Sequence, residues 1–322
     1  MKSTIILTNY LYIICYNIFG CEKMNELLNK CMLCPRNCGV NRNNNELGFC
    51  KMGKDLMVAR AALHFWEEPI ISGKKGSGTV FFSGCNLKCV FCQNFQISTN
   101  NFGKKITPER LSEIFLELQS KGANNINLVT PTHFIPQIIE AITQAKEKGL
   151  NLPIVYNSSG YEKVETIKLL KGYIDIYLPD FKYFDDRYAI KYSKCPNYFE
   201  YASKSIAEMI SQTGKPIFNG EGLLVKGTVV RHMMLPGLLE DSKKIINYLV
   251  ENYNDDIFIS IMNQYTPTNN IQKYPEINRT INDEEYTSLI DYAIDIGIKN
   301  GFMQEGETQK TSFIPEFDTT GV

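Results

Sequence analysis

Three cysteines in one short loop are the residues of this chain best suited to redox chemistry. They are spaced as Cys85-x3-Cys89-x2-Cys92 in FFSGCNLKCVFCQN, directly after an apolar run typical of a strand. A four-iron cluster held entirely by protein takes four thiolates, so three would leave one iron open, as metal sites are when they admit substrate. The non-catalytic interpretations are a zinc knuckle or three buried thiols. Zinc sites usually combine Cys-x2-Cys units with a fourth ligand, and the present spacing fits that pattern poorly.

Four more cysteines precede this loop. Their spacing is Cys31-x2-Cys34-x3-Cys38-x11-Cys50, and four thiolates can hold a second iron–sulfur cluster or a tetrahedral zinc ion. The surrounding residues 24–75 have few periodic apolar side chains. A segment that cannot form much hydrophobic core needs another source of stability, such as a bound metal. We therefore interpret the four as a structural metal site, with iron–sulfur and zinc both open. We interpret the remaining cysteines as small apolar side chains without a metal-binding role. They are Cys15, Cys21 and Cys195.

The composition is that of a globular protein with a substantial core. Of 322 residues, 43% are hydrophobic and 21% charged, and the net charge is −1. No basic block indicates a nucleic-acid partner. Seven of the ten cysteines fall in two tight groups, which favours metal ligation over a disulfide scaffold. Because ligand thiols must remain reduced, we predict a cytoplasmic location without a membrane partner.

The first 23 residues are the one segment that could indicate export. They contain an apolar stretch after a lysine, but Thr8, Asn9 and Asn17 interrupt it, and it is too short to span a bilayer. Met24 follows directly and opens a credible protein start. We interpret residues 1–23 as an over-extended start or a leader that is not an export signal.

Short apolar runs alternate with amphipathic segments from residue 76 to residue 322. Thr107–Gly122 has helical periodicity with a capping residue, and another helix begins at Asn282 with Glu285 as its capping-box partner. Strands separated by such helices predict parallel βαβ units. Six units suit an α/β fold of the partial (β/α)6 barrel type, with site residues at the carboxyl ends of the strands, although a doubly wound sheet has the same pattern. The expected strands are Gly78–Ser83, Asn125–Thr130, Leu152–Asn157, Ile174–Pro179, Leu223–Met234 and Asp256–Met262.

The cysteine loop resembles that of the radical SAM superfamily. In that family an aromatic residue precedes the third cysteine, and Phe91 holds this position. The resemblance implies a radical SAM barrel with a [4Fe–4S] cluster on Cys85, Cys89 and Cys92. It further implies that S-adenosylmethionine (SAM) chelates the open iron, that Phe91 packs near its adenine, and that reduction releases a 5′-deoxyadenosyl radical.

More specifically, residues 24–300 resemble the relatives of pyruvate formate-lyase activating enzyme. In that family the segment matching Asn157 and Ser158 helps to hold SAM, the acid matching Asp180 faces a monovalent cation, and the lysine matching Lys182 faces the SAM carboxylate. Arg231 resembles a strand-end arginine of the same enzymes. Each of these residues also has a purely structural interpretation. The polar residues at 157–160 could simply form a turn, Asp180 and Lys182 could be an exposed ion pair, and Arg231 could be a solvated strand-end residue. The matching stretches are GSGTVFFSGCNLKCVFCQN, NINLVTPTHF, PIVYNSSGYE, DIYLPDFKYF, RHMMLPG and SIMNQYTP.

One segment departs from the family pattern. The Gly-Gly-Glu that contacts the SAM amino group is absent, and residues 129–133 take its place. Thr130, Thr132 or backbone carbonyls could accept from the ammonium instead. His133 could act in acid–base chemistry together with Arg231, since histidine titrates near neutral pH, or it could be a hydrogen-bonded structural residue.

A pair of acids, Glu67 and Glu68, lies between the two cysteine groups beside the only tryptophan. The pair could fold over the cluster mouth, where neighbouring carboxylates alter one another's pKa. A solvated face is the commoner arrangement for such a pair, and we favour it.

These motifs predict a radical SAM enzyme, an oxidoreductase that abstracts hydrogen through the deoxyadenosyl radical. In the narrow form its substrate is a glycine of a partner glycyl-radical enzyme, and in the broad form it is another peptide, nucleotide or metabolite. The expected partners are a reducing electron donor, such as a flavodoxin or ferredoxin, and in the narrow form a protein substrate. A non-catalytic iron–sulfur electron carrier and a zinc-dependent binding module are the alternatives. Three loop ligands inside a barrel-sized domain disfavour both.

Overall fold

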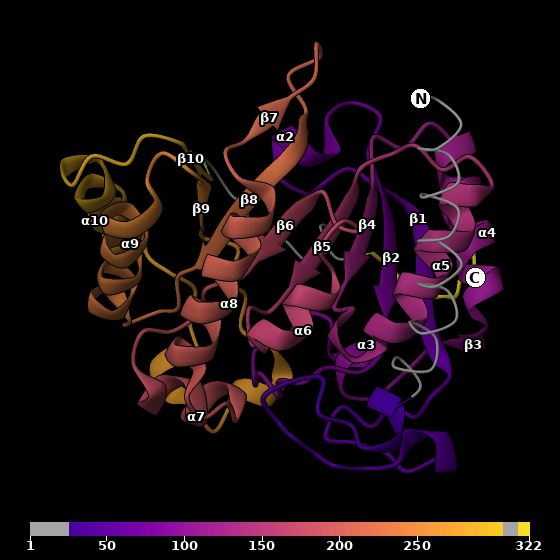
Figure 1. Ribbon diagram of the computed structural model, residues 1–322. Helices are drawn as coiled ribbons and strands as arrows, with labels where there is room; N and C mark the ends of the chain where they lie inside the picture. The colour runs from indigo at the N-terminus through magenta and orange to yellow at the C-terminus, as the bar shows by residue number, and fades with distance from the viewer. Residues whose placement is uncertain (1–25, 305–314) are drawn as a thin grey trace.

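One large β-sheet organises the chain. The computed structural model describes residues 26–304 and 315–322, so the leader predicted at residues 1–23 lies outside the described residues. The strands are β1 (Leu56–His64), β2 (Ser77–Phe82), β3 (Lys104–Ile106), β4 (Ile126–Val129), β5 (Ile154–Ser158), β6 (Ile176–Pro179), β7 (Ile217–Phe218), β8 (Leu224–Met233), β9 (Phe258–Met262) and β10 (Gly301–Met303). They pair in the order β10-β9-β8-β6-β5-β4-β2-β1-β3, with β7 beside β8 (Figure 1).

The parallel part of the sheet confirms the predicted α/β barrel fold. β2, β4, β5, β6, β8 and β9 are parallel neighbours in chain order, and each of the six expected strands is present. A doubly wound sheet would reverse its strand order at a switch point, whereas this order runs in one direction. The sheet is therefore that of a partial barrel, whose parallel strands end at a common rim.

The helices also begin where capping residues predict. The Thr107 side chain accepts from the Arg110 amide at the start of α4, and Asn282 forms a capping box with Glu285 at the start of α10. Figure 1 shows the longer helices along the sheet. The helices are α2 (Pro69–Ser72), α3 (Phe95–Ser98), α4 (Pro108–Ser120), α5 (Ile135–Glu147), α6 (Val164–Leu169), α7 (Asp186–Ser193), α8 (Tyr198–Thr213), α9 (Leu239–Tyr253) and α10 (Asp283–Asp295), with 3-10 turns η1 (Arg42–Asn44), η2 (Thr132–Phe134), η3 (Asn269–Ile271) and η4 (Pro275–Ile277).

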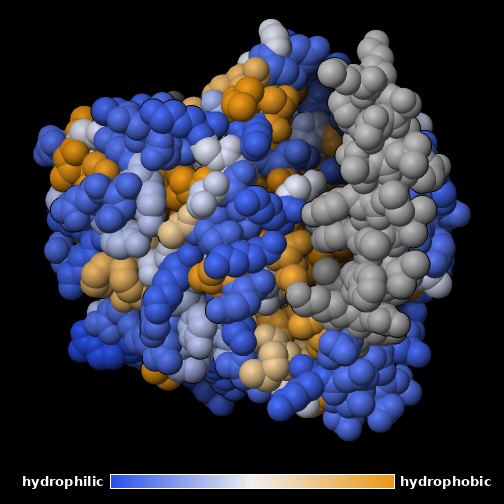
Figure 2. Space-filling view, in the orientation of Figure 1, coloured by the Kyte–Doolittle hydropathy of each residue, from blue (hydrophilic) through white to orange (hydrophobic). Residues whose placement is uncertain are grey.

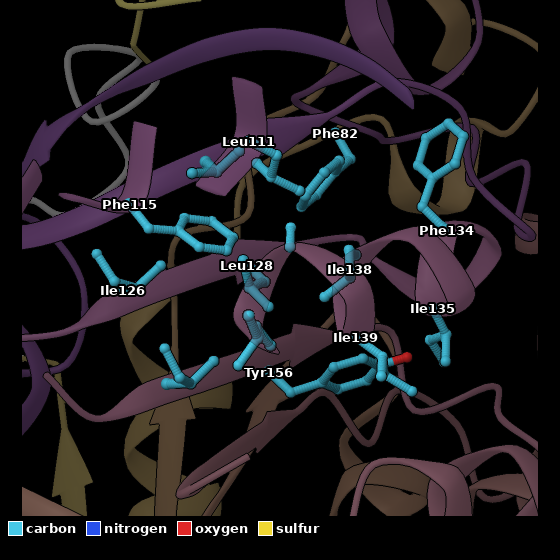
Figure 3. Close-up of a cluster of buried hydrophobic side chains, with 14 of the residues drawn as sticks. Phe82, Leu111, Phe115, Ile126, Leu128, Phe134, Ile135, Ile138, Ile139 and Tyr156 are labelled. Carbon is cyan, nitrogen blue, oxygen red and sulfur yellow. The ribbon is translucent and has the colours of Figure 1, made fainter. Parts of the chain in front are cut away.

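The largest core lies between the sheet and helices α4 and α5. Phe115 of α4 and Ile138 of α5 pack with Leu128 of β4 in one buried cluster (Figure 3). β2 and β4 are buried at every position, because sheet and helices cover both of their faces. This packing fixes the strands whose ends carry the candidate site.

The sheet begins earlier in the chain than residue 76. β1 lies within the segment predicted as Cys-rich, and it pairs antiparallel with β2. Residues 315–322 in turn lie along β1. The Thr319 amide donates to the Ala59 carbonyl, and the Ala61 amide donates to the Thr320 carbonyl, both at 2.9 Å. The chain end is thus built into the outer side of the sheet.

One hydrophobic patch stands out on the face of the molecule in Figure 2. Figure 2 shows hydrophobic residues gathered over β7, where Ile217 and Phe218 are 52% and 40% exposed. In the described part of the chain, no helix is both long enough and apolar enough to cross a membrane.

Candidate active site

A cavity of about 260 Å³ opens at the carboxyl ends of the parallel strands. It lies near the lower end of the volume range for small-molecule sites. Cys85, Cys89 and Cys92 line it, together with Asp180 and Arg231 from the ends of β6 and β8. The cysteine loop and the strand-end residues predicted from the sequence therefore face one space.

The cysteine loop is held in place by other segments of the chain. The Val90 amide donates to the Tyr192 carbonyl at the end of α7 (2.8 Å). On the other side, the Arg36 guanidinium donates to the Asn86 carbonyl (2.8 Å). These contacts come from residues far away in the chain, so the loop geometry depends on the complete fold.

The three loop sulfurs are suited to act as thiolate ligands. Burial raises the pKa of the Cys85 thiol to about 12 and that of Cys89 to about 11, so a metal must displace their protons. Each sulfur also lies within hydrogen-bond distance of a donor, which favours the thiolate form. The contacts are the Leu87 amide to Cys85 at 3.4 Å, the Ser193 hydroxyl to Cys89 at 3.0 Å and the Ser98 hydroxyl beside Cys92 at 3.2 Å.

Arg231 is the centre of a buried polar network beneath the loop. Its guanidinium donates to Glu67 (2.7 Å), Asn157 (2.8 Å) and Asp180 (2.9 Å). Lys182 donates to the second oxygen of Asp180 (2.7 Å). The structure thus brings together four residues predicted for the site (Asn157, Asp180, Lys182 and Arg231), and it adds Glu67 to them.

The network sets the charge of Asp180. Burial would raise the pKa of this carboxyl, but the Arg231 and Lys182 cations outweigh burial and lower it below the ordinary value. The resemblance implies a monovalent cation facing this acid. In this chain, two side-chain cations already contact both carboxylate oxygens. Arg231 is therefore a positioning group for the acid rather than the solvated residue considered as its alternative.

The solvated face favoured for Glu67 and Glu68 is corrected by the structure. Glu67 accepts from Asn127 and Asn157 (2.9 Å each), besides Arg231, and its side chain is only 10% exposed. Glu68 accepts from Ser260 (2.8 Å), and burial raises its pKa to about 7. Because β1 is antiparallel to β2, the chain that follows β1 enters the barrel from the end opposite the cysteine loop. Donors on the strands make this burial favourable.

Phe91 and Ser158 also lie at the cavity. Phe91 is 5% exposed, its ring centroid is 5.8 Å from that of Tyr265, and it lines the cavity wall. Ser158, at the end of β5, is buried and accepts from the Gly160 amide (3.3 Å). Both residues are therefore placed to bound a ligand, Phe91 with an apolar face and Ser158 with a small polar one.

Residues 129–133, which replace the Gly-Gly-Glu of the family, lie partly at the cavity and partly in the core. Thr130 lines the cavity with a φ of +59°, an outlier for a β-branched residue and a mark of stored strain. Thr132 instead donates to buried Glu162 (2.6 Å). His133 is buried behind the loop with Nε2 2.7 Å from the Ser83 carbonyl, and burial lowers its pKa to about 3. It does not line the cavity, so its position favours the structural interpretation.

Tyr198 of α8 supports the strand ends and was not identified from the sequence. Its hydroxyl lies 2.8 Å from the Ser159 carbonyl, 3.0 Å from the Asp180 carbonyl and 2.9 Å from the Lys182 amide. Gly160 allows this close approach, because a Cβ at its position, with φ of +75°, would overlap the Asp180 carbonyl. No local motif marks Tyr198, since its partners come from other elements.

Glu162 should give the folding stability a pH dependence. It is fully buried, and burial raises its pKa from 4.5 to about 8 although Thr132 donates to it. The folded state therefore binds this proton more tightly than the unfolded state. The stabilisation that the bound proton gives the folded state is complete below pH 4.5 and is lost as the pH rises through 8. Between pH 5 and 8 we expect the unfolding free energy to fall about 3 kcal/mol more in the native chain than in Glu162→Gln.

Urea denaturation followed by circular dichroism at each pH measures this difference. The exposed Glu165→Gln is the matched control, and its pH profile should follow that of the native chain. Parallel profiles for native protein and Glu162→Gln would show that the buried carboxyl is not protonated in the folded state.

The four upstream cysteines occupy a separate place. Cys31, Cys34, Cys38 and Cys50 do not line the cavity, and none of them is in a disulfide. Among the described residues, no group of three or more His, Cys, Asp or Glu side chains has the spacing of a single-ion site. Neither the four upstream cysteines nor the three cysteines of the loop have the sulfur spacing of a single-ion site.

Comparisons with known proteins identify the family of this chain. The model of the family described as the radical SAM superfamily matches residues 79–249. An uncharacterized protein of Methanocaldococcus jannaschii is 32% identical over 284 residues, which cover 84% of this chain and 76% of that protein. A second protein of the same organism, provisionally named as a glycyl-radical enzyme activating enzyme, is 30% identical over 176 residues, covering 54% of this chain and 69% of the relative.

Solved structures with similar folds have low sequence identity. SuiB of Streptococcus suis bound to S-adenosylmethionine is 14% identical with a TM-score of 0.48, covering 74% of this chain and 51% of SuiB. A domain of a pyruvate-formate lyase-activating enzyme from Bacteroides vulgatus is 14% identical with a TM-score of 0.38, covering 54% of this chain and 91% of that domain. The chain thus spans about half the length of SuiB.

Proposed function

Since this chain belongs to the radical SAM superfamily, we propose that it is an enzyme that reductively cleaves S-adenosylmethionine and uses the product radical to abstract hydrogen from a substrate. The family uses a [4Fe–4S] cluster and SAM, which supply an electron and the 5′-deoxyadenosyl radical. Radical SAM enzymes need a reductant, for which a flavodoxin or ferredoxin in the cytoplasm is our proposal.

The residues at the cavity divide the binding work. Cys85, Cys89 and Cys92 hold three irons of the cluster as thiolates, each with a hydrogen-bond donor beside its sulfur. Lys182 provides an ammonium for the SAM carboxylate, since a lysine is a flexible donor for such a group. Phe91 provides an apolar wall for the adenine.

The strand ends orient these groups without taking part in the reaction. Arg231 and Asp180 fix the position of Lys182 through the Asp180 carboxylate. Asn157 and Glu67 complete the hydrogen bonding of the Arg231 guanidinium. Thr130 lies where the family places its Gly-Gly-Glu, and its strained backbone supports a role in holding the SAM ammonium.

The observation that carries the proposal is the shared cavity. Three cysteines in one loop, without a fourth, face the carboxyl ends of β5, β6 and β8, where the polar network lies. An electron carrier has no need of an open iron next to a ligand cavity, and a zinc module has no need of a barrel around its thiols. The arrangement therefore favours an enzyme over both alternatives.

Cleavage of SAM by the reconstituted protein tests the proposal. The full chain is purified anaerobically, its cluster is reconstituted and reduced with dithionite, and SAM is added. We expect 5′-deoxyadenosine to accumulate, measured by liquid chromatography and mass spectrometry. A protein with an intact, reducible cluster that leaves SAM unchanged would instead be the electron carrier.

Within this class, we propose a glycyl-radical enzyme activase as the narrower function. Similarity over 176 residues to the M. jannaschii protein provisionally named as such an activating enzyme supports it. The reduced protein, mixed with SAM and a glycyl-radical enzyme from the same genome, should then produce the electron paramagnetic resonance doublet of a glycyl radical. Formation of 5′-deoxyadenosine without that signal would point to a different substrate.

A further inference from the structure

The four upstream cysteines lie in a segment that has little regular structure. Between residues 30 and 55 the only helix or strand is the single 3-10 turn η1. Its own apolar cluster is small, with Leu28, Cys31 and Leu33 as the buried members, while Cys50 and Met52 pack in the main core. So little apolar burial does not offset the entropy of ordering a loop of this length. Another source of stability must hold the segment.

The upstream sulfurs are close together and accept hydrogen bonds as ligands do. A Cβ on Gly48 would lie 3.4 Å from the Cys38 sulfur and 3.7 Å from the Cys50 sulfur, so a glycine leaves the space between them free. The Phe49 amide donates to Cys38 (3.2 Å).

This hydrogen-bond pattern recurs in the loop that faces the cavity. In each group a backbone amide donates to a cysteine sulfur, from Phe49 to Cys38 in the upstream segment and from Leu87 to Cys85 in the loop. Backbone amides aimed at sulfur stabilise thiolates and are among the interactions that tune thiolate-bound clusters. One upstream sulfur thus accepts the same kind of backbone hydrogen bond as a sulfur of the loop.

Two arginines near these sulfurs have no carboxylate partner within the part of the chain that the structure describes. Arg42 is fully buried and, among the described residues, donates to the carbonyls of Gly53 and His133. Arg36 has a buried Nη2 without a hydrogen-bond partner. In the described residues no carboxylate forms an ion pair with either guanidinium. A buried cation without a counter-charge is strongly unfavourable, so an anion belongs at this place.

We propose that Cys31, Cys34, Cys38 and Cys50 bind a metal centre through four thiolates, with Arg36 and Arg42 balancing its charge. Four thiolates around Zn²⁺, or around an oxidised [4Fe–4S] core, leave two negative charges, which equals the charge of the two guanidinium groups. Because the four sulfurs lack the spacing of a single-ion site, zinc would require them to move closer together, whereas a cluster gives each cysteine its own iron. The proposal goes beyond the proposed function and does not depend on it.

The position of this centre gives it a supporting role for the cavity loop. Gly84, which precedes Cys85, touches the upstream segment so closely that a Cβ there would lie 2.6 Å from Met52 and 2.8 Å from the Cys50 carbonyl. The Arg36 contact to Asn86 adds a second link. The metal centre would therefore fasten residues 30–54 to the back of the loop that ligates the active-site cluster.

Metal analysis of the full chain tests the proposal. Iron, zinc and acid-labile sulfide per chain are measured after anaerobic purification for the native protein, Cys38→Ser, Cys89→Ala and the matched control Cys195→Ser. We expect Cys38→Ser to lose either one zinc, or four irons with four sulfides, relative to the native protein. We expect Cys195→Ser to lose neither. The lost element identifies the metal.

Cys89→Ala keeps all four upstream cysteines, so it tests the site even if Cys38→Ser does not fold. We expect it to retain the same zinc, or a full four-iron complement, at the upstream site. Equal metal in native protein and Cys38→Ser, or a Cys89→Ala protein without zinc and iron, would overturn the proposal. None of these measurements depends on SAM cleavage, so failure of the proposed enzyme activity would be seen separately.

Discussion

Replacing Cys89 by alanine is expected to abolish the formation of 5′-deoxyadenosine from S-adenosylmethionine while the barrel remains folded. Cys89 is one of the three loop thiols, and the Ser193 hydroxyl donates to its sulfur (3.0 Å). With two thiols left, an iron of the cluster loses its only protein ligand. Changes to groups that merely orient metal ligands cost 10–100-fold in affinity or activity, so loss of a ligand should reduce product by at least about 100-fold.

Cys195→Ala is the matched control for this experiment. Cys195 is a buried thiol in the same apolar cluster against which Cys89 packs, but it is outside both cysteine groups. Its replacement should leave product formation within about twofold of the native rate, because only a small cavity is created. Far-UV circular dichroism on both variants checks the fold. A Cys89→Ala protein that forms product at the native rate would remove this cysteine from the cluster ligands.

The barrel could be predicted from the sequence because its strands are covered on both faces. Such strands read as continuous apolar runs, as β2 and β4 do at every position. Chain order then places the strand ends on one rim. Asp180, Lys182 and Arg231 are assigned to the same site through the resemblance to the activating-enzyme relatives, and their places at strand ends agree with that assignment.

β1 and the end of the chain could not be predicted in this way. The buried positions of β1 do not alternate regularly. Residues 315–322, which lie far away in the sequence, form hydrogen bonds along β1 and cover part of it. The ion pair between Arg60 and Asp318 joins residues 258 positions apart. A pattern within nine residues does not contain a partner at that distance.

The partners of Arg231 show the same limit within the site. Glu67 precedes it by 164 positions, and a Glu-Glu pair in a polar stretch is usually solvated. What buries Glu67 is a convergence of donors from β4, β5 and β8, which appears only after the barrel closes. His133 is the converse case, since its residue type suggested chemistry and its surroundings, the Ser83 carbonyl and the Phe134 ring, are structural.

The second large effect is expected from Arg231→Met. The substitution removes the cation between Glu67 and Asp180, whose side chains are only 10% and 18% exposed. Breaking a buried ion pair by removing one partner typically costs 3–5 kcal/mol, because a carboxylate is left buried without compensation. We therefore expect the unfolding free energy to fall by about 3 kcal/mol or more, measured by urea denaturation of anaerobically purified protein.

Arg187→Met provides the matched control on the surface. Arg187 pairs with Asp185 at 2.6 Å, but its side chain is 82% exposed. Exposed pairs contribute about 0–1 kcal/mol because water and salt screen them. Both variants lose an arginine, but only Arg231→Met leaves buried carboxylates without their partner. The difference between their unfolding free energies therefore measures the effect of burying the charge.

Glu67→Gln in the Arg231→Met background tests why the loss is large. If the cost comes from an uncompensated carboxylate, neutralising Glu67 should recover about 1–2 kcal/mol, and the two substitutions should be non-additive by a similar amount. The Asn127 and Asn157 side chains, which contact one Glu67 oxygen, can still bond to the glutamine amide. Additive losses in the double variant would mean that Arg231 stabilises the barrel through packing of its side chain, and that Glu67 is held by the asparagines alone.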